Sequence, residues 1–271
     1  MYSLYIVPTP IGNLEDITLR ALRILKEVSL IAAEDTRTTK VLLNHFDIKT
    51  PLISYHEHNK LYRLDDLFSA LAIGDVALVS DAGTPGISDP GYELIKAAIE
   101  QDIPIVSLPG PNAAITALVA SGLPTDRFVF LGFPPRKTAQ LRQFVEELVN
   151  EPSTMIFYES PHRIAKTLNV FNEVFGQRSA VVIRELTKFY EEIVRGTLDE
   201  LYQHFLENPA RGEITLLIES APPETDELWD ENRVLTELKS RLGKGEKRSV
   251  AVKAVAKRSG WDRREVYNLD I

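Results

Sequence analysis

The chain has 271 residues, of which 44% are apolar and 26% charged, and it contains no cysteine. This composition is typical of a folded globular protein, and the length suits about two domains of roughly 150 residues each. The lack of cysteine excludes disulfides, thiolate metal sites, iron–sulfur clusters and a cysteine nucleophile. The chain lacks a basic and apolar leader, and no run approaches the roughly 18 apolar residues of a membrane span. We therefore expect a cytoplasmic protein without a membrane partner.

Charge is distributed unevenly along the chain. The net charge is −8, yet the segment from Lys239 to Arg264 holds ten basic and two acidic residues and so carries +8. The rest of the chain therefore carries −16. Such asymmetry favours contact between this segment and a polyanion, although a solvated helix surface explains the same run of charge.

The first part of the chain alternates short apolar runs with helical patterns, which predicts an α/β domain with a parallel sheet over residues 1–122. The expected strands are Leu4–Val7, Leu30–Ala33, Val76–Ser80 and Ile103–Leu108, and the expected helices include Asp89–Gln101 and Ala113–Ser121.

A break at residues 122–126 precedes a second stretch of the same alternating kind, which predicts a second α/β domain over residues 123–221. Its helices carry the apolar positions of 141–149 and 164–175. Its expected strands are Phe128–Leu131, Thr154–Tyr158, Ala180–Ile183, Phe189–Val194 and Glu213–Glu219.

After a linker at residues 221–225, the apolar positions of residues 226–271 keep helical spacing alone. Ser259, Gly260 and Trp261 predict a turn, and Asp262 with Glu265 forms the pattern of a capping box. Helix, turn and helix with basic faces resemble a helix-turn-helix.

Three segments that follow expected strands are rich in small and turn-forming residues: Pro8–Leu14, Val79–Gly91 and Leu108–Ala114. Because the carboxyl ends of parallel strands lie at one edge of a sheet, these segments predict a single ligand cleft. A turn with Asp89 as helix N-cap is the alternative explanation for Val79–Gly91, but its three glycines, two aspartates and two prolines exceed what a turn requires. Neither G-x-G-x-x-G nor a P-loop pattern occurs, which argues against a dinucleotide-binding fold and a P-loop NTPase.

Polar residues suited to catalysis lie at similar junctions, namely Glu34–Arg37, Tyr158–Arg163 and Arg184–Lys188. Helix capping and local ion pairs are the alternative explanation for each group. His56 and His58 have the spacing of metal ligands on one strand face, but without cysteine or a third ligand we expect no metal. The G-x-S-x-G pattern of a serine hydrolase is absent.

These motifs occur in the order seen in the tetrapyrrole methylase superfamily, and the chain resembles that superfamily over nearly its whole length. The matching stretches are Val7–Leu14, Glu34–Arg37, Ser80–Gly91, Leu108–Asn112, Phe157–Arg163, Arg184–Lys188 and Gly212–Thr215. Within it, the chain is most similar to the bacterial enzymes that methylate the ribose 2′-hydroxyl of a cytidine in small-subunit ribosomal RNA.

The resemblance implies two α/β domains with the ligand cleft between them, S-adenosylmethionine as methyl donor, a homodimer, and small-subunit RNA or the assembled subunit as partner. Carried over by position, the donor-binding residues would be Pro10, Asp81, Gly83, Thr84, Ala113, Ala114, Tyr158, Glu159 and Thr215. Members that modify tetrapyrroles carry a glycine-rich first loop and Gly-Asp-Pro at the third site. This chain has Pro-Thr-Pro-Ile-Gly and Ser80-Asp81-Ala82-Gly83 there, which argues against a tetrapyrrole substrate.

Methyl transfer to a ribose hydroxyl needs alignment of donor and acceptor, and a carboxylate or a lysine of lowered pKa at the hydroxyl proton would help. We assign this catalytic role to Glu159 and Lys188. RNA phosphate contacts are assigned to arginines and lysines: Arg37, Arg163, Arg184, Lys253, Lys257, Arg258, Arg263 and Arg264. Two alternatives stay open, a small-molecule methyltransferase acting on a tetrapyrrole and a nucleotide sensor without catalytic activity.

Overall fold

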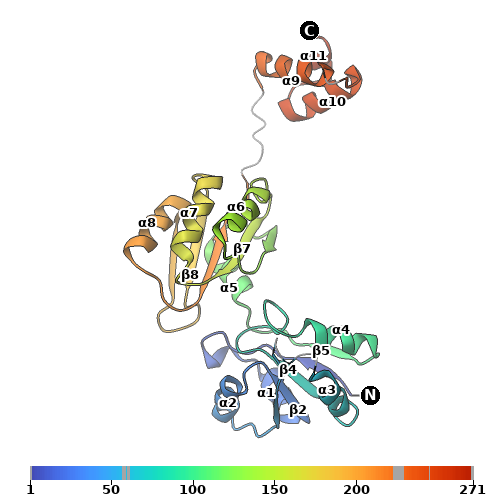
Figure 1. Ribbon diagram of the computed structural model, residues 1–271, viewed down its shortest axis with the longest axis vertical. Coiled ribbons are helices and arrows are strands. Elements are labelled where there is room, and N and C mark those ends of the chain that lie inside the picture. The colour runs from blue at the N-terminus through green and yellow to red at the C-terminus, as the bar shows by residue number, and fades with distance from the viewer. Residues whose placement is uncertain (1, 57–58, 60–61, 222–228, 244, 270–271) are drawn as a thin grey trace. The chain divides into compact units, whose positions relative to one another are not determined.

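The structure is a computed structural model that describes residues 2–56, 59, 62–221, 229–243 and 245–269. The chain divides into two compact units, Met1–Ala221 and Pro222–Ile271. The larger unit contains two five-stranded sheets, and the smaller unit is helical where it is described (Figure 1). Most of the predicted linker falls on 222–228, outside the described residues.

The first sheet is entirely parallel, as the alternating pattern predicts, and its strands lie in the order β3-β2-β4-β1-β5. The strands are β1 (Leu4–Ile6), β2 (Leu30–Ala33), β3 (Leu52–Ser54), β4 (Val76–Val79) and β5 (Ile105–Ser107). The α/β fold class is therefore confirmed.

Helices cover both faces of this sheet because successive strand residues point to opposite faces. In β4, Ala77 and Val79 pack with α1 (Leu19–Glu27) and α2 (Thr36–His45), whereas Val76 and Leu78 pack with α3 (Leu64–Leu71) and α4 (Tyr92–Glu100). A short 3-10 helix, η1 (Leu14–Asp16), precedes α1. The helix predicted at Asp89–Gln101 begins at Tyr92, with Gly91 as N-cap.

The second sheet differs from the prediction, because the alternation favoured a parallel sheet and the structure has a mixed one in the order β6-β7-β10-β8-β9. β6 and β7 run parallel, whereas the β7–β10, β10–β8 and β8–β9 pairs are antiparallel. The short connection between β8 and β9 lacks the crossover helix that a parallel pair needs. The strands are β6 (Phe128–Phe130), β7 (Thr154–Glu159), β8 (Ser179–Arg184), β9 (Glu192–Thr197) and β10 (Ile214–Ile218).

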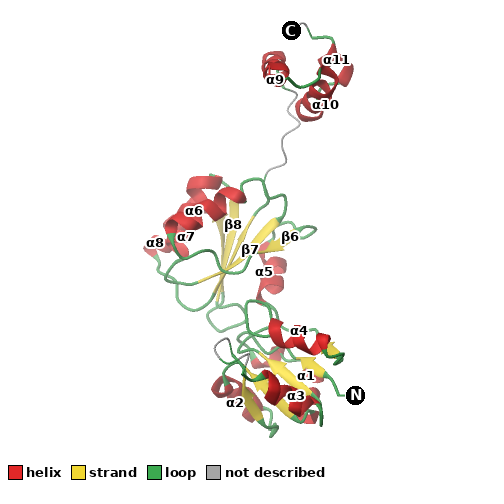
Figure 2. Cartoon of the chain, turned by 45° about the vertical axis from the view of Figure 1, so that its right-hand side comes forward, coloured by secondary structure: helices red, strands yellow, loops and turns green. Residues whose placement is uncertain are grey.

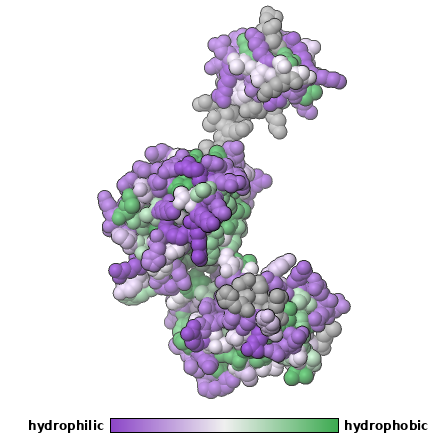
Figure 3. Space-filling model, in the orientation of Figure 1, coloured by the Kyte–Doolittle hydropathy of each residue, from purple (hydrophilic) through white to green (hydrophobic). Residues whose placement is uncertain are grey.

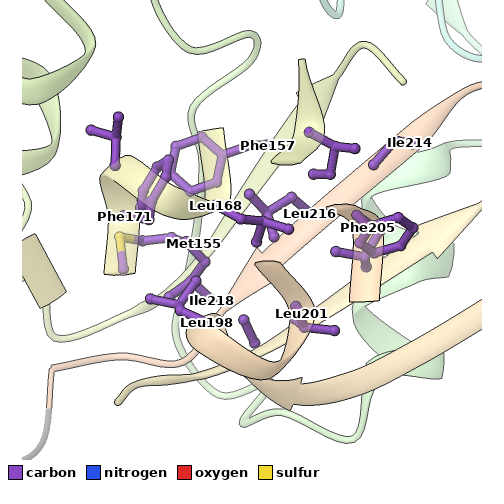
Figure 4. Packing of buried hydrophobic residues seen from close by; sticks show 14 of the residues in the cluster. Met155, Phe157, Leu168, Phe171, Leu198, Leu201, Phe205, Ile214, Leu216 and Ile218 are labelled. Carbon is purple, nitrogen blue, oxygen red and sulfur yellow. The ribbon is translucent and has the colours of Figure 1, made fainter. Parts of the chain in front are cut away.

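Helices α6 (Thr138–Glu147), α7 (Ile164–Phe175) and α8 (Leu198–Glu207) cover one face of the second sheet, and α5 (Ala113–Ser121) covers the other (Figure 2). Figure 4 shows the first of these interfaces, where the Phe157 ring meets Phe171 at a centroid distance of 5.2 Å. The α5 residues precede the predicted domain boundary at 122, yet they pack on the second sheet.

The smaller unit consists of α9 (Glu231–Gly243), α10 (Arg248–Ser259) and α11 (Arg263–Tyr267), which enclose a core of their own. The predicted turn and capping box are confirmed, because Gly260 is left-handed and Glu265 accepts the Asp262 N–H at 3.1 Å. Hydrophilic residues predominate on the face of the smaller unit that Figure 3 shows. Among the described residues, no helix has the length and apolar character that crossing a membrane requires.

Candidate functional site

The first pocket of the larger unit is a cavity of about 280 Å³ that residues of both sheets line. From the first sheet come segments that follow β1, β2, β4 and β5. From the second come the segment after β6, the ends of β7 and β8 with the segment after β8, and the start of β10. Its lining residues are Ile11, Glu34, Asp81–Thr84, Ile87–Asp89, Asn112, Ala113, Phe133, Tyr158, Glu159, Ile183, Leu186 and Glu213–Thr215.

Backbone hydrogen bonds join two of the loops that line the pocket. Thr9 and Gly83 exchange two N–H···O bonds of 2.9 Å, and the Thr9 hydroxyl donates to Ser80 O at 3.0 Å. Gly83 has a φ of +83°, a conformation that side chains disfavour, and a Cβ at this position would lie 3.4 Å from Ile11. The segment after β4 is therefore fixed against the segment after β1.

Five carboxylates line the pocket, and three of them, Glu34, Asp81 and Asp89, come from segments after strands of the first sheet. Asp35 N donates to Asp81 Oδ1 at 3.0 Å, and Asp81 N lies 3.3 Å from Glu34 Oε2. Burial is the main cause that raises the pKa of both Glu34 and Asp81. Burial, together with the charges of Glu34 and Asp81, raises the pKa of Asp89 to about 7. The pocket therefore favours a cationic ligand.

The structure brings seven of the nine predicted donor-binding residues together in this pocket. They are Asp81, Gly83, Thr84, Ala113, Tyr158, Glu159 and Thr215. The other two lie nearby, because Pro10 lines a second pocket and Ala114 is buried between α5 and the second sheet. Their donor-binding roles stay predictions.

Glu159 is buried, and both of its carboxylate oxygens already have partners. Ser160 N donates to Oε1 and the Thr167 hydroxyl to Oε2, each at 2.6 Å, and Arg163 Nη2 lies 3.3 Å from Oε2. These contacts tie the end of β7 to the start of α7. They favour a positioning role over that of a free base, and the predicted catalytic role stays untested.

Lys188 is held by two carboxylates, with Nζ 2.9 Å from Glu185 Oε1 and 3.1 Å from Glu213 Oε2. Burial alone lowers the pKa of Lys188, but the hydrogen bonds and charges of the two carboxylates outweigh it and raise the pKa above its usual value. The lysine of lowered pKa that we expected is therefore replaced by a charged ammonium group. Lys188 is therefore suited to stabilising negative charge, and its predicted catalytic role stays a prediction.

The three arginines of the larger unit that were predicted to bind phosphate differ in their exposure and in their hydrogen-bond partners. The side chain of Arg37 is 89% exposed and pairs with the neighbouring Asp35. Arg163 donates to Pro134 O and Pro135 O, and Arg184 pairs with Glu192 at 2.9 Å. Arg37 is thus the freest of the three, and the phosphate-binding role of each stays a prediction.

The second pocket, with a volume of about 320 Å³, adjoins the first at Asp81. It is lined by Thr9, Pro10, Gly12, Leu14, Thr38, Thr39, Val41, Leu42, Ser80 and Asp81. Thr39 is 3% exposed, and its hydroxyl has no hydrogen-bond partner among the described residues. A buried and unpartnered hydroxyl costs folding free energy.

We expect Thr39→Val to raise the free energy of unfolding by about 1–3 kcal/mol, because valine keeps the shape and removes the unpartnered hydroxyl. Urea unfolding followed by circular dichroism measures this change. Thr38→Val on the exposed side of α2 is the control and should change stability by less than about 0.5 kcal/mol. A loss of stability in Thr39→Val would show that the hydroxyl is satisfied in the folded protein.

Glu34, Asn112 and Asp89 line the pocket and lie in segments that the sequence singled out, but none of the three was individually assigned a binding or catalytic role. Each had a simpler explanation in the sequence, since acidic and amide residues at strand ends are common N-caps. Asn112 does cap α5, with its side chain accepting from Ile115 N at 3.1 Å. For Asp89, the structure assigns the N-cap to Gly91 instead, which removes the simpler explanation.

The described residues contain no group of three or more histidines, cysteines, aspartates or glutamates that could hold a metal ion. His56 follows β3 in a loop, and His58 lies outside the described residues. The metal-free expectation therefore stays a prediction.

We compared the sequence and the fold with those of known proteins. The sequence profile of the tetrapyrrole (corrin/porphyrin) methylases matches residues 3–202. The chain belongs to this family. The crystal structure of uroporphyrin-III-C-methyltransferase from Thermus thermophilus superimposes with a TM-score of 0.59 at 19% identity, covering 82% of this chain and 96% of that one, and so shows the shared fold.

Two full-length relatives of this methylase carry the same name. Ribosomal RNA small subunit methyltransferase I of Halalkalibacterium halodurans is 49% identical over 98% of this chain and 94% of its own length. The protein of that name from Synechocystis sp. is 48% identical, covering 100% of this chain and 98% of its own. The similarity therefore extends through the C-terminal helices, beyond the residues that the family profile matches.

Proposed function

We propose that this methylase transfers a methyl group from S-adenosylmethionine to the ribose 2′-hydroxyl of a cytidine in small-subunit ribosomal RNA. The observation that carries the proposal is full-length identity near 50% to proteins named as ribosomal RNA small subunit methyltransferases. The basic C-terminal unit, which lies outside the matched family profile, gives the chain a surface suited to RNA.

The first pocket fits such a donor by the chemistry of its lining. The negative charge of Glu34, Asp81 and Asp89 suits a sulfonium cation, and the small residues Gly83 and Ala113 allow a ligand to approach the backbone closely. Apolar residues of the same pocket, Ile11, Ile183 and Leu186, provide surface for an aromatic base. When bound, the donor supplies an electrophilic methyl group.

The residues of the chain contribute to this reaction mainly by position and charge. A cavity between two sheets can hold donor and acceptor in line while excluding bulk water. Glu159 holds the loop after β7, and Lys188 joins that side of the pocket to Glu213 at the start of β10. Both act on residues that line the pocket, and so both can affect turnover without accepting a proton.

The decisive experiment uses tritiated S-adenosylmethionine and small ribosomal subunits from cells that lack this protein. After incubation with the purified enzyme, the RNA is digested and its nucleosides are separated. We expect label in 2′-O-methylcytidine. Label on a base, or transfer to a porphyrinogen or corrinoid detected in parallel by absorbance, would contradict the proposed acceptor.

Donor binding is expected to need no metal. Calorimetric titration with S-adenosylmethionine should give the same affinity with and without excess chelator, because carboxylates, small residues and apolar side chains line the pocket without a metal-binding group among the described residues. A chelator that abolished binding or methyl transfer would show that a metal takes part.

A homodimer is part of the same proposal, as the family resemblance implies. Sedimentation equilibrium of the purified chain at micromolar concentration measures it, and a mass near twice 30.5 kDa is expected.

A further inference from the structure

We propose that the segment after β6, residues 132–137, is an RNA-binding surface that holds unpaired nucleotides next to the one that is methylated. The inference rests on the proposed function and deepens it, because it assigns RNA contacts at the opening of the first pocket. Phe133 supplies an aromatic ring on which a base can stack, and Arg136 and Lys137 supply positive charge for phosphates.

Phe133 lies at the opening of the first pocket, because it lines the cavity and is nevertheless 59% exposed. Its ring meets the ring of Tyr158, which lines the same pocket, at a centroid distance of 5.7 Å and an interplanar angle of 61°. The rest of the Phe133 ring is accessible to solvent. An aromatic ring in this position buries little area in the folded protein, but it offers a flat surface for any unpaired base.

The turn that carries Phe133 is held from both sides of the pocket. Tyr158 N donates to Gly132 O at 2.9 Å, which continues the pairing of β6 with β7. Gly132 is left-handed with a φ of +63°, and the hydroxyl oxygen of Ser88 lies 3.6 Å from where a Cβ of this glycine would be. Ser88 follows β4 and lines the same pocket. The turn therefore fixes the Phe133 backbone where the two sheets meet.

The residues after Phe133 are fixed as well. Arg163 Nη2 donates to the carbonyl oxygens of Pro134 and Pro135, each at 3.0 Å. The same guanidinium lies 3.3 Å from the buried carboxylate of Glu159. The two prolines restrict the backbone further. An RNA strand would thus meet a surface that is already ordered, which lowers the entropy cost of binding.

Two cations follow the prolines, and the local structure does not account for them. Arg136 and Lys137 are exposed, and neither has an ion-pair partner among the described residues, whereas Arg142 within α6 pairs with Glu173. Lys137 is the N-cap residue of α6 and makes no capping hydrogen bond with its side chain. Serine, threonine, aspartate and asparagine are the residues that favour this position. The two unpaired charges are therefore suited to a polyanion outside the chain.

These observations favour RNA over two other occupants of the surface. The methyl donor carries no phosphate, and the carboxylates deeper in the pocket already suit its sulfonium charge. A second copy of the chain would have to bury the charges of Arg136 and Lys137, and burying a charge without a partner is costly. RNA satisfies the ring and both cations together, because each of its nucleotides has a base and a phosphate.

The first test removes the ring. We expect Phe133→Ala to weaken binding of labelled small-subunit RNA, measured by fluorescence anisotropy, about 5- to 150-fold, which corresponds to the loss of one stacked base. The slope of log affinity against log salt should stay at its wild-type value, because the ring is uncharged. Phe133→Tyr keeps the ring and should bind near wild type. The matched control is Tyr2→Ala, which removes a 46% exposed ring at the amino end of β1, away from the pocket.

The second test removes the cations. Changing both Arg136 and Lys137 to glutamine should flatten the salt slope by about 1.4–1.8, at about 0.7–0.9 for each phosphate contact. The control changes Arg20 and Lys26, two exposed cations of α1, to glutamine and should leave the slope unchanged. The ring variant and the cation variant thus give different signatures in one assay.

The other possible results each decide the question. Wild-type RNA affinity in Phe133→Ala would overturn the proposal. So would a loss of donor affinity in calorimetry, which would place the ring in the donor site, or a halved mass in sedimentation equilibrium, which would place it between two copies. If the variants lose RNA affinity as expected but no label from tritiated donor enters RNA with the wild type, the RNA-binding surface stands and the proposed function fails. If the wild type methylates RNA and both variants keep its affinity and salt slope, the function stands and this inference is wrong.

Discussion

Glu159→Ala is expected to lower the free energy of unfolding of the larger unit by about 3–5 kcal/mol, because it removes one partner of a buried charged network. The Glu159 side chain is fully buried, and three groups depend on it: the Ser160 N–H, the Thr167 hydroxyl and the Arg163 guanidinium. Thr167 is itself buried, and so its hydroxyl would lose its partner without gaining water. Urea unfolding followed by circular dichroism measures the loss.

Glu159→Gln separates the structural role from the catalytic role that we predicted from the sequence. Glutamine keeps the shape but loses the charge, and hydrogen bonds to a charged group contribute about 1.5–3 kcal/mol. In a double-mutant cycle with Thr167→Val, a coupling of at least 0.5 kcal/mol is expected because the two side chains are in direct contact. The opposite result, wild-type stability with turnover reduced about 100-fold or more, would make Glu159 the proton acceptor and contradict its positioning role.

The order of strands and helices could largely be predicted, because hydrophobic periodicity is a local property of the sequence. Strand direction in the second sheet could not, since an apolar run has the same pattern whether its neighbours are parallel or antiparallel. The strand predicted at Phe189–Val194 illustrates a further limit. Phe189 and Tyr190 have strand-forming side chains, but they are 94% and 69% exposed, and β9 begins only at Glu192.

The candidate site shows the same division between local and tertiary information. Segments after strands were correctly expected to meet, because parallel strands end at one edge of the sheet. The sequence does not reveal which carboxylates of the pocket already accept hydrogen bonds from neighbouring groups in the folded protein. Glu159 finds its partners in the turn and helix that follow β7, whereas the pKa of Asp89 is raised by burial and then by the charge of Glu34, more than 50 residues earlier in the chain.

Neutralising exposed basic residues of the C-terminal unit is expected to weaken RNA binding and to flatten its dependence on salt. Four such residues, each exposed, are Lys247, Lys253, Arg263 and Arg264. Lys257 and Arg258, also predicted to bind RNA, lie on α10, but their side chains are outside the described part. Arg241 is left unchanged because it already pairs with Glu237 and Glu246.

The four-residue change to glutamine should leave the fold of this unit intact. Its core is apolar and separate from these side chains, with Val234, Leu238, Val252 and Val255 fully buried. Trp261 Nε1 donates to Trp229 O at 2.6 Å, which links the turn before α11 to the segment before α9. The near-ultraviolet circular dichroism of the two tryptophans should therefore be the same in the variant and in the wild type.

Each phosphate contact contributes about 0.7–0.9 to the slope of log affinity against log salt. Loss of four contacts should flatten this slope by about 3. When the salt concentration rises from 50 to 200 mM, the factor by which RNA affinity falls should therefore be about 60 times smaller in the variant than in the wild type. Fluorescence anisotropy with labelled small-subunit RNA measures the slope, and calorimetry should show unchanged donor affinity. The matched control replaces four exposed basic residues of the larger unit with glutamine: Arg20, Lys26, Lys96 and Lys166.

The two interpretations of the basic segment differ in what the control shows. If the segment binds RNA, the C-terminal variant loses slope and the control does not. If its charges are only solvated, the two variants behave alike, since changes in total charge then act equally wherever they are placed. Deletion of residues after Ala221 extends the test, because the larger unit has hydrophobic cores of its own and should keep donor binding. The deletion should flatten the salt dependence at least as much as the four-residue change. A deletion variant that binds RNA with the wild-type slope would show that the C-terminal unit makes no phosphate contact.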